Sequence, residues 1–208
     1  MTHTLHRRGD KEGLREDYVM LILYSKGINE EGAQEKFKKI WDIIKKHGSE
    51  VVNFGNVTAG NSHTATFEDL QNSENKLVHA VFKDRDKLKA CLRDIKEGNF
   101  GLSVVLSGIY EDVKRVWSEI GLKPHTVEHS LGIHGKTDLL PDENILEIST
   151  MCGHSLVFPH LVCHMVEQIK GGHLTFEEAA DRLSRGCACG IFNPYRAGKI
   201  LRKIVENG

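Results

Sequence analysis

The chain has 208 residues, with 28 Lys and Arg against 29 Asp and Glu, and a formal net charge of −1. This length suits one domain, or one domain with an appended subdomain. An apolar content of 39% can form a core and excludes whole-chain disorder, and the balanced charge gives no reason to expect a nucleic-acid partner. The longest apolar run, Tyr18–Tyr24, is far shorter than the roughly 20 residues that cross a bilayer, so we expect no membrane partner.

The first two thirds of the chain predict strands mixed with helices. Residues 1–16 are polar, predict a flexible lead-in and contain no apolar stretch typical of a secretory signal. Apolar runs predict strands over residues 18–24, 51–57, 77–82 and 102–109, and apolar residues at helical spacing predict helices over 30–47, 85–97 and 110–120. The polar stretch 58–75 predicts a long hairpin loop or two ragged strand ends.

A last strand is predicted where Val127, His129, Leu131 and Ile133 alternate with other residues. The order of the elements before it, strand-helix-strand-strand-helix-strand, is that of a ferredoxin-like split βαβ unit, which a further helix and strand would extend at one edge. We therefore predict an α+β fold with a ferredoxin-like domain over residues 17–136. Such sheets pair edge to edge, so a homo-oligomer formed through the sheet edge is one expected partner.

Residues 137–208 predict a helical subdomain of three helices that carries most of the cysteines. Pro159 suits a first helical turn, Thr175–Glu178 is a capping box, and Asn193 is a suitable N-cap. The first two helices are similar in length and are joined by a short Gly-Gly link, so we expect them to run antiparallel. The chain then returns to the point from which it left.

This return predicts a cysteine cluster, because Cys152 precedes the first helix while Cys187 and Cys189 follow the second. Three thiols with the neighbouring His154 suit tetrahedral zinc, or an iron–sulfur cluster held by three thiolates. We therefore predict Cys152, Cys187 and Cys189 as ligands, with His154 as the fourth ligand or as a hydrogen-bond donor to one. The alternative is that they are small buried residues at tight turns.

The remaining candidates for chemistry are fewer. Cys91 lies on the apolar stripe of a helix and is predicted to serve packing only. His79 and His129 each alternate with apolar residues, so either they are satisfied core side chains or the sheet contributes to a site. An odd number of cysteines without an export signal favours reduced thiols and a cytoplasmic protein.

Two other functions compete with metal binding. A ferredoxin-like domain can be a regulatory module that binds a small molecule between copies, although only fold analogy supports this. A cysteine-dependent enzyme would use Cys152 with His154 or a sheet histidine. A nucleophile needs no second and third thiol beside it, and for this reason metal binding is preferred.

The closing segment also carries a resemblance. The pieces Thr150-Met-Cys-Gly-His154, Leu174-Thr-x-Glu-Glu-Ala-Ala180 and Cys187-Ala-Cys-Gly-Ile-Phe-Asn-Pro194 resemble the end of uncharacterised archaeal proteins of the methanogenesis-marker type, over about residues 145–205. The resemblance implies an anaerobic cytoplasm and a role in metal- and cofactor-rich one-carbon metabolism. We therefore expect a metal- or iron–sulfur-binding protein of anaerobic metabolism, with a redox protein as a further partner.

Overall fold

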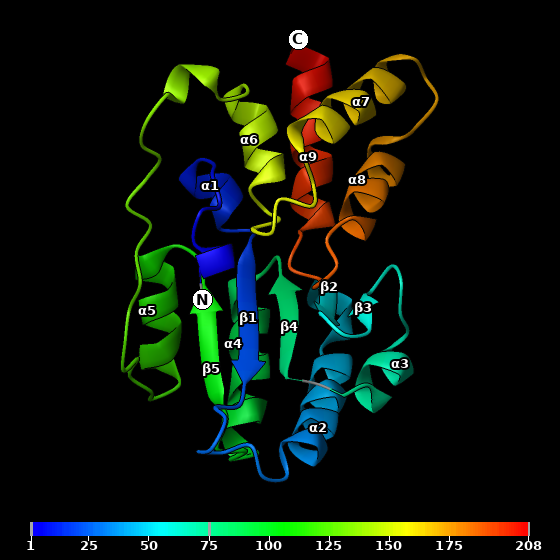
Figure 1. Cartoon of the computed structure of the whole chain (residues 1–208). Coiled ribbons are helices and arrows are strands. Elements are labelled where there is room, and N and C mark those ends of the chain that lie inside the picture. The colour runs from blue at the N-terminus through cyan, green and yellow to red at the C-terminus, as the bar shows by residue number, and fades with distance from the viewer. Residues whose placement is uncertain (1, 75, 208) are drawn as a thin grey trace.

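The computed structural model describes residues 2–74 and 76–207, and it is α+β (Figure 1). Within these residues one antiparallel sheet of five strands has the order β3-β2-β4-β1-β5. Its strands are β1 (Tyr18–Leu23), β2 (Val51–Asn56), β3 (Gly60–Asn61), β4 (Leu77–Phe82) and β5 (Ser103–Ser107). The central strands β1 and β4 are almost wholly buried, as their continuous apolar runs predict.

Helices connect and follow the strands. The bounds are α1 (Lys11–Leu14), α2 (Ala33–Lys46), α3 (Phe67–Asn72), α4 (Arg85–Glu97), α5 (Tyr110–Glu119), α6 (Glu143–Ser149), α7 (Pro159–Lys170), α8 (Phe176–Arg185) and α9 (Pro194–Asn207). The predicted start signals are confirmed: Thr175 and Glu178 form the capping box of α8, and Oδ1 of Asn193 accepts from the backbone N–H of Arg196 at 2.9 Å. No helix in the described ranges is long and apolar enough to cross a membrane.

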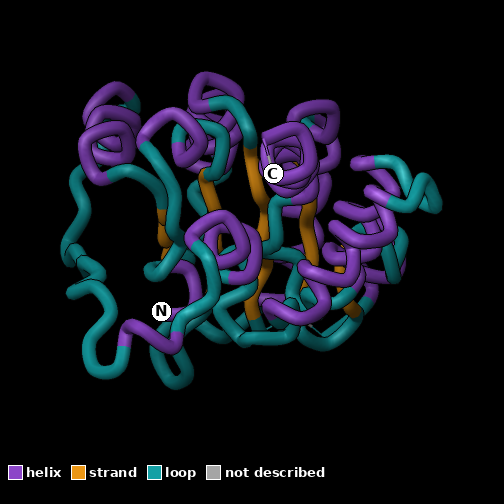
Figure 2. The backbone as a smooth tube through the Cα atoms, turned by 90° about the horizontal axis from the view of Figure 1, so that it is seen from above, coloured by secondary structure: helices purple, strands orange, loops and turns teal. Residues whose placement is uncertain are grey.

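Two hydrophobic cores lie on opposite faces of the sheet. Alternate residues of β1 and β4, such as Met20 and Ala80, pack with α2, α4 and α5. Val19 and Val81, the sequence neighbours of Met20 and Ala80, pack instead against residues of α6 to α9. Figure 1 shows α6 to α9 gathered at the end of the sheet where β1 begins, and Figure 2 shows the helices on both sides of the strands. Because His79 alternates with Val78 and Ala80, it faces the side of α6 to α9.

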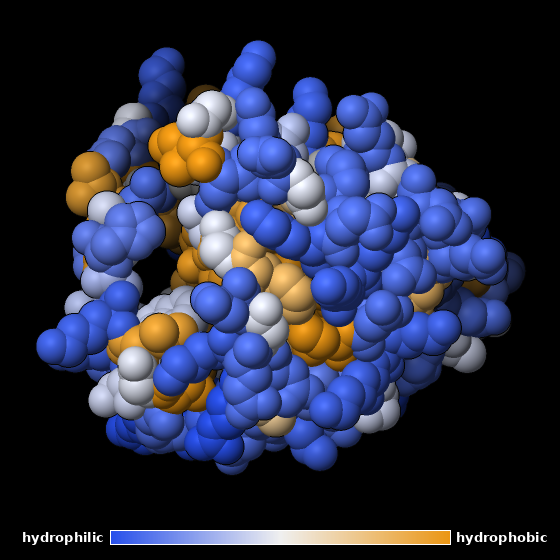
Figure 3. Space-filling view, turned by 90° about the horizontal axis from the view of Figure 1, so that it is seen from below, coloured by the Kyte–Doolittle hydropathy of each residue, from blue (hydrophilic) through white to orange (hydrophobic). Residues whose placement is uncertain are grey.

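The predicted last strand over residues 127–133 is wrong, because residues 122–134 form neither helix nor strand. Val127, Leu131 and Ile133 are exposed, so pairing this segment would bury little apolar surface against the cost of ordering it. A cavity of about 620 Å³ separates the segment from β5, the edge strand that it was expected to extend. Figure 3 shows the opening as a gap at one side of the molecule.

Two further segments differ from the sequence prediction. The polar stretch 58–75 contains the short strand β3 and the helix α3, which Thr66 and Asp69 begin with a capping box. The predicted flexible lead-in contains a short 3-10 helix (Thr2–Thr4) and α1, and its side chains contact distant parts of the chain; Met1 lies outside the described residues. Nη1 of Arg7 donates to Asp17 at 2.7 Å, and Nη1 of Arg196 donates to the same carboxylate at 3.1 Å.

Candidate thiol and histidine site

The loop between α8 and α9 holds two of the three predicted cysteines. It turns immediately after α8, where the backbone N–H of Gly190 donates to the carbonyl of Cys187 at 3.1 Å. Gly190 has φ +77°, and a Cβ there would overlap the backbone of Phe54 in β2. Only glycine combines this left-handed conformation with so close an approach, so the Cys-Ala-Cys-Gly sequence positions both thiols against the sheet.

Two buried asparagines of the β2–β3 hairpin hold this loop. Nδ2 of Asn61 donates to the carbonyl oxygens of Ser184 at 3.1 Å and Cys187 at 2.8 Å. Nδ2 of Asn53 donates to Oγ of Ser184 and to the carbonyl of Phe192. Both asparagines are fully buried, and sequence reasoning missed them because the polar stretch that includes Asn61 is typical of an exposed loop. Its excess of asparagine was the available signal.

Cys152 joins the two loop cysteines from the other side. It lies just after α6, where its backbone N–H donates to the carbonyl of Ser149 at 3.2 Å. The three thiols influence one another in series, Cys152 with Cys187 and Cys187 with Cys189. All three cysteines are buried and none forms a disulfide. The structure thus brings together the three cysteines that the helix lengths predicted to meet.

The series of thiols makes the last of them the most acidic. Hydrogen bonding to Cys187, followed by burial, raises the pKa of Cys152 well above its ordinary value. Cys187 feels the thiol of Cys152 most strongly, which lowers its pKa, but the thiol of Cys189 and burial together raise it to about 11. The pKa of Cys189 is lowered, first by the hydrogen bond from Cys187 and also by the backbone N–H of Ile191. Negative charge is therefore best stabilised on Cys189.

Three histidines continue the series from Cys189. Nδ1 of His154 lies 3.6 Å from Sγ of Cys189, and the exposed ring of His154 stacks on His3 with centroids 4.7 Å apart. Nε2 of His3 lies 3.3 Å from Nε2 of His79. A Cβ at residue 153 would overlap the backbone carbonyl of His3, so Gly153 is what allows the N-terminal segment to reach the site. Sequence reasoning did not connect His3 with the thiols.

Burial keeps two of these imidazoles neutral. His79 is 1% exposed, and desolvation, followed by the nearby His3, lowers its pKa to about 3. Desolvation and the nearby His154 lower the pKa of His3 to about 4. The neutral imidazole is the form that binds metal ions, and the buried Nδ1 of His79 has no partner in hydrogen-bonding geometry.

The donor set has the chemistry of a soft-metal site, since it combines three thiols with imidazoles and backbone N–H groups directed at sulfur. Within residues 2–74 and 76–207, however, no group of three or more His, Cys, Asp or Glu side chains has the arrangement that holds a metal ion. Of the three thiols, the one that His154 contacts is Cys189.

The remaining two cysteines and His129 lie away from the site. Cys91 is buried with Leu88 and Leu92 in the core on the opposite face of the sheet, as its stripe predicts. Cys163 is exposed on α7. His129 lies in the irregular segment 122–134, where its ring contacts Tyr110 at a centroid distance of 5.0 Å. Of the two histidines whose role the sequence left open, His79 therefore belongs to the cluster and His129 does not.

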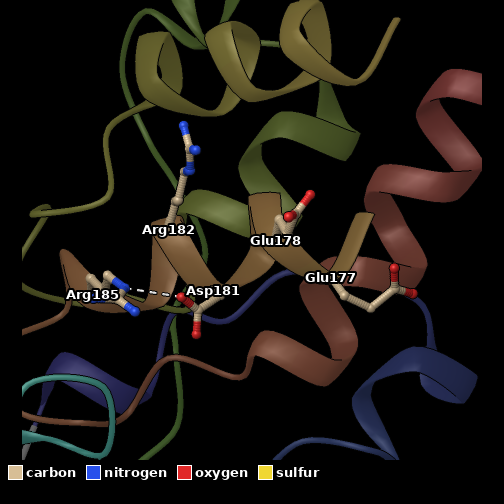
Figure 4. A pocket seen from close by; sticks show the side chains of 5 residues that line it. All are labelled: Glu177, Glu178, Asp181, Arg182 and Arg185. Carbon is tan, nitrogen blue, oxygen red and sulfur yellow. Dashed lines mark hydrogen bonds and ion pairs between the residues drawn. The ribbon is translucent and has the colours of Figure 1, made fainter. Parts of the chain in front are cut away.

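A hollow of about 630 Å³ on the surface of α8 offers no comparable chemistry. Charged side chains line it, and the ion pair between Nε of Arg185 and Oδ2 of Asp181 measures 2.9 Å, while Arg182 points away from that pair (Figure 4). Nδ1 of His63 also lies 2.6 Å from Oδ1 of Asp181. These contacts describe a solvated helix face with locally paired charges.

Comparison with protein-family models, curated proteins and solved structures finds no match for this chain. The thiol and histidine cluster therefore has to be interpreted from its own geometry and chemistry.

Proposed function

We propose that this protein binds a metal ion or an iron–sulfur cluster through Cys152, Cys187 and Cys189, with His154 as the fourth donor or as a hydrogen-bond donor to Cys189. The observation that carries the proposal is the group of three reduced, buried thiols that neighbour one another in one core. A buried thiol is a weak hydrogen-bonding group, and packing alone gives no reason to place three in contact. On loading, the thiols would lose their protons, because the thiolate is the form of cysteine that binds a metal.

The surroundings of the sulfur atoms support the same proposal. Backbone N–H groups of Leu156 and His154 face Cys152, and that of Ile191 faces Cys187 and Cys189. Each of these N–H groups acts to lower the pKa of the thiol that it faces. Such hydrogen bonds stabilise thiolates and tune the potential of bound clusters. The resemblance over residues 145–205 extends the proposal to a cytoplasmic protein of anaerobic one-carbon metabolism that exchanges electrons with a redox partner.

A cysteine-dependent enzyme is the second candidate, and the contact between Cys189 and His154 favours it. The lowered pKa of Cys189 and an imidazole 3.6 Å away are the features of an activated thiol. Against it, Cys189 is fully buried, and a nucleophile has to reach its substrate. Rapid alkylation of Cys189 by iodoacetamide in the native protein would favour this candidate over metal binding.

The architecture is also part of the proposal. We infer a ferredoxin-like sheet with an appended helical cysteine-bearing unit, and the strand order β2-β4-β1-β5, antiparallel throughout, supports it. Among the described residues β5 pairs only with β1, and this unpaired edge supports a homo-oligomer formed through the sheet edge. The cavity beside that edge supports the alternative of a regulatory module for a small molecule, which a thermal-shift screen of metabolites would detect.

The decisive experiment is the metal and sulfide content of protein purified without oxygen. We expect about one zinc ion or one brown iron–sulfur cluster per chain, retained in Cys91→Ala and lost in Cys187→Ser. Cys91 is the matched control because it is equally buried, but in the other core. Full metal content in Cys187→Ser, or no metal in the wild-type chain after reconstitution, would contradict the proposal.

A further inference from the structure

The imidazoles beside the thiols have no role in a site made of three cysteines and His154 alone. His79 is buried in the middle of β4, paired with Leu21 across β1 and with Gly55 across β2. A polar side chain in that position costs free energy unless its polar atoms are used, and Nδ1 of His79 has no partner. Its Nε2 is directed at His3, while the backbone of Cys189 lies beside its ring. The ring of His79 therefore lies between His3 and the backbone of the thiol loop.

His3 is held at the site because neighbouring residues of the N-terminal segment contact both the sheet and the residue that follows α6. Oγ1 of Thr4 lies 2.7 Å from Oγ of Ser107 in β5, and the backbone N–H of Arg8 donates to Oγ1 of Thr150 at 3.1 Å. Arg7 pairs with Asp17 and also donates to the carbonyl of Ile191, two residues beyond Cys189. The N-terminal segment thus binds the same loop that carries the thiols, and its histidine ring lies between those of His79 and His154.

We infer that His3 and His79 are further donors to the centre proposed at Cys152, Cys187, Cys189 and His154, and that this centre takes a borderline divalent ion such as Zn²⁺. The inference rests on the proposed function. The three imidazoles adjoin one another, and His154 contacts Cys189, so the centre has a mixed nitrogen and sulfur donor set that supplies the four ligands of a tetrahedral Zn²⁺, whereas iron–sulfur clusters are held mainly by thiolates. A bound ion would also fasten the N-terminal segment to β4 and to the thiol loop.

The test uses the full-length chain, reduced and free of oxygen, titrated with Co²⁺ and then with Zn²⁺ in competition. Variants His79→Gln and His3→Gln remove one imidazole each, and His129→Gln is the control because His129 lies outside the cluster. We expect thiolate-to-cobalt charge-transfer absorption in the wild type. His79→Gln and His3→Gln should keep that absorption but bind Co²⁺ about tenfold or more weakly, while His129→Gln binds as the wild type does. X-ray absorption of the zinc-loaded wild type should show imidazole scattering that decreases in both variants.

The other outcomes separate the inference from the proposed function. If both histidine variants bind as the wild type does while Cys187→Ser loses the charge-transfer band, the inference fails and the proposed function stands. The same holds if the wild-type chain assembles a brown cluster and does not bind Co²⁺ or Zn²⁺. If the wild type takes up no metal at all, both fail. Should circular dichroism show His79→Gln unfolded, His3→Gln decides, because its side chain is only half-buried in a surface segment.

Discussion

The carboxylate of Asp17 accepts a hydrogen bond from Nη1 of Arg196 at 3.1 Å, and both side chains are buried. Asp17 immediately precedes β1 and Arg196 lies in the first turn of α9, so this contact joins the start of the sheet to the last helix. Arg7 donates to the same carboxylate, which therefore balances two guanidinium groups.

Asp17→Asn should destabilise the protein by about 3–5 kcal/mol, because it leaves the buried Arg7 without its carboxylate partner and leaves Arg196 with Glu147 alone, at 3.3 Å. The measurement is denaturant unfolding followed by circular dichroism. Glu16→Gln is the control, since Glu16 pairs with Lys199 of the same helix at 2.6 Å but in a more exposed position, and should cost less than about 1 kcal/mol. If the two variants lost the same free energy of unfolding, burial of the Asp17 ion pairs would not explain their contribution to stability.

Asn61→Ala should cost about 2–3 kcal/mol and expose the thiols, because it removes two buried hydrogen bonds to the backbone of the cysteine loop. Unfolding measurements and the rate of thiol alkylation test the two effects. Asn72→Ala, at an exposed position in α3, should change neither. Alkylation of Cys187 and Cys189 at the wild-type rate in Asn61→Ala would contradict the role of Asn61 in holding the loop.

Asp94→Asn should remove a pH-dependent contribution to stability. Hydrogen bonds from Lys46 and then His47 lower the pKa of Asp94 below its ordinary 3.8, so the contribution is present above that pH and is lost as the pH falls through the folded-state pKa. At neutral pH we expect the variant to be less stable by about 0.5–1 kcal/mol, with the difference from wild type shrinking in acid. Urea unfolding at several pH values measures this, and a difference that stays constant on acidification would argue against it.

Cys189→Ser should release the proposed metal and accelerate amide hydrogen exchange in α9 by about tenfold or more, without global unfolding. The cysteine loop leads directly into Asn193, the N-cap of α9, so a bound ion would order both. Cys163→Ser on the exposed face of α7 is the control. Unchanged protection over Pro194–Asn207 after complete metal loss would mean that the helix and the site are independent.

Trypsin should cleave first after Lys136, because residues 122–136 are exposed and irregular and border a cavity. Lys46 has an exposed side chain but lies at the end of α2, so cleavage there should be much slower. Mass spectrometry of early fragments measures the order. Cleavage at Lys46 before Lys136 would show that the segment is better ordered than its contacts suggest.

Local patterns predicted most of the secondary structure, because periodicity and capping act within a few residues. The helix Arg85–Glu97 begins at Asp84, whose side chain accepts from the backbone N–H of Lys87, as the sequence indicated. The convergence of Cys152 with Cys187 followed from helix lengths alone. The prediction of a strand over residues 127–133 failed for a different reason. Alternation of apolar and polar residues shows that a segment can form a strand, but it does not show whether the edge of a sheet lies close enough to pair with it.

The histidines could not be placed from the sequence for a related reason. His3 and His79 are 76 residues apart, and their contact depends on the arginine pairs that draw the N-terminal segment across the molecule. Nothing near His3 in the sequence records those distant partners. For His79, strand alternation predicted its face correctly, but only the tertiary structure shows what covers that face.

The cysteines are distributed over the surface and the two cores, so their reactivity toward a thiol reagent reports separately on the opening of each core. Cys163 is open to solvent, Cys91 is sealed on one face of the sheet, and Cys152, Cys187 and Cys189 are sealed on the other. In the metal-free protein, a thiol-labelling time course resolved by residue would therefore separate opening of one face from opening of the other. Labelling of Cys91 and Cys187 at one common rate would mean that the two faces open as a single cooperative unit.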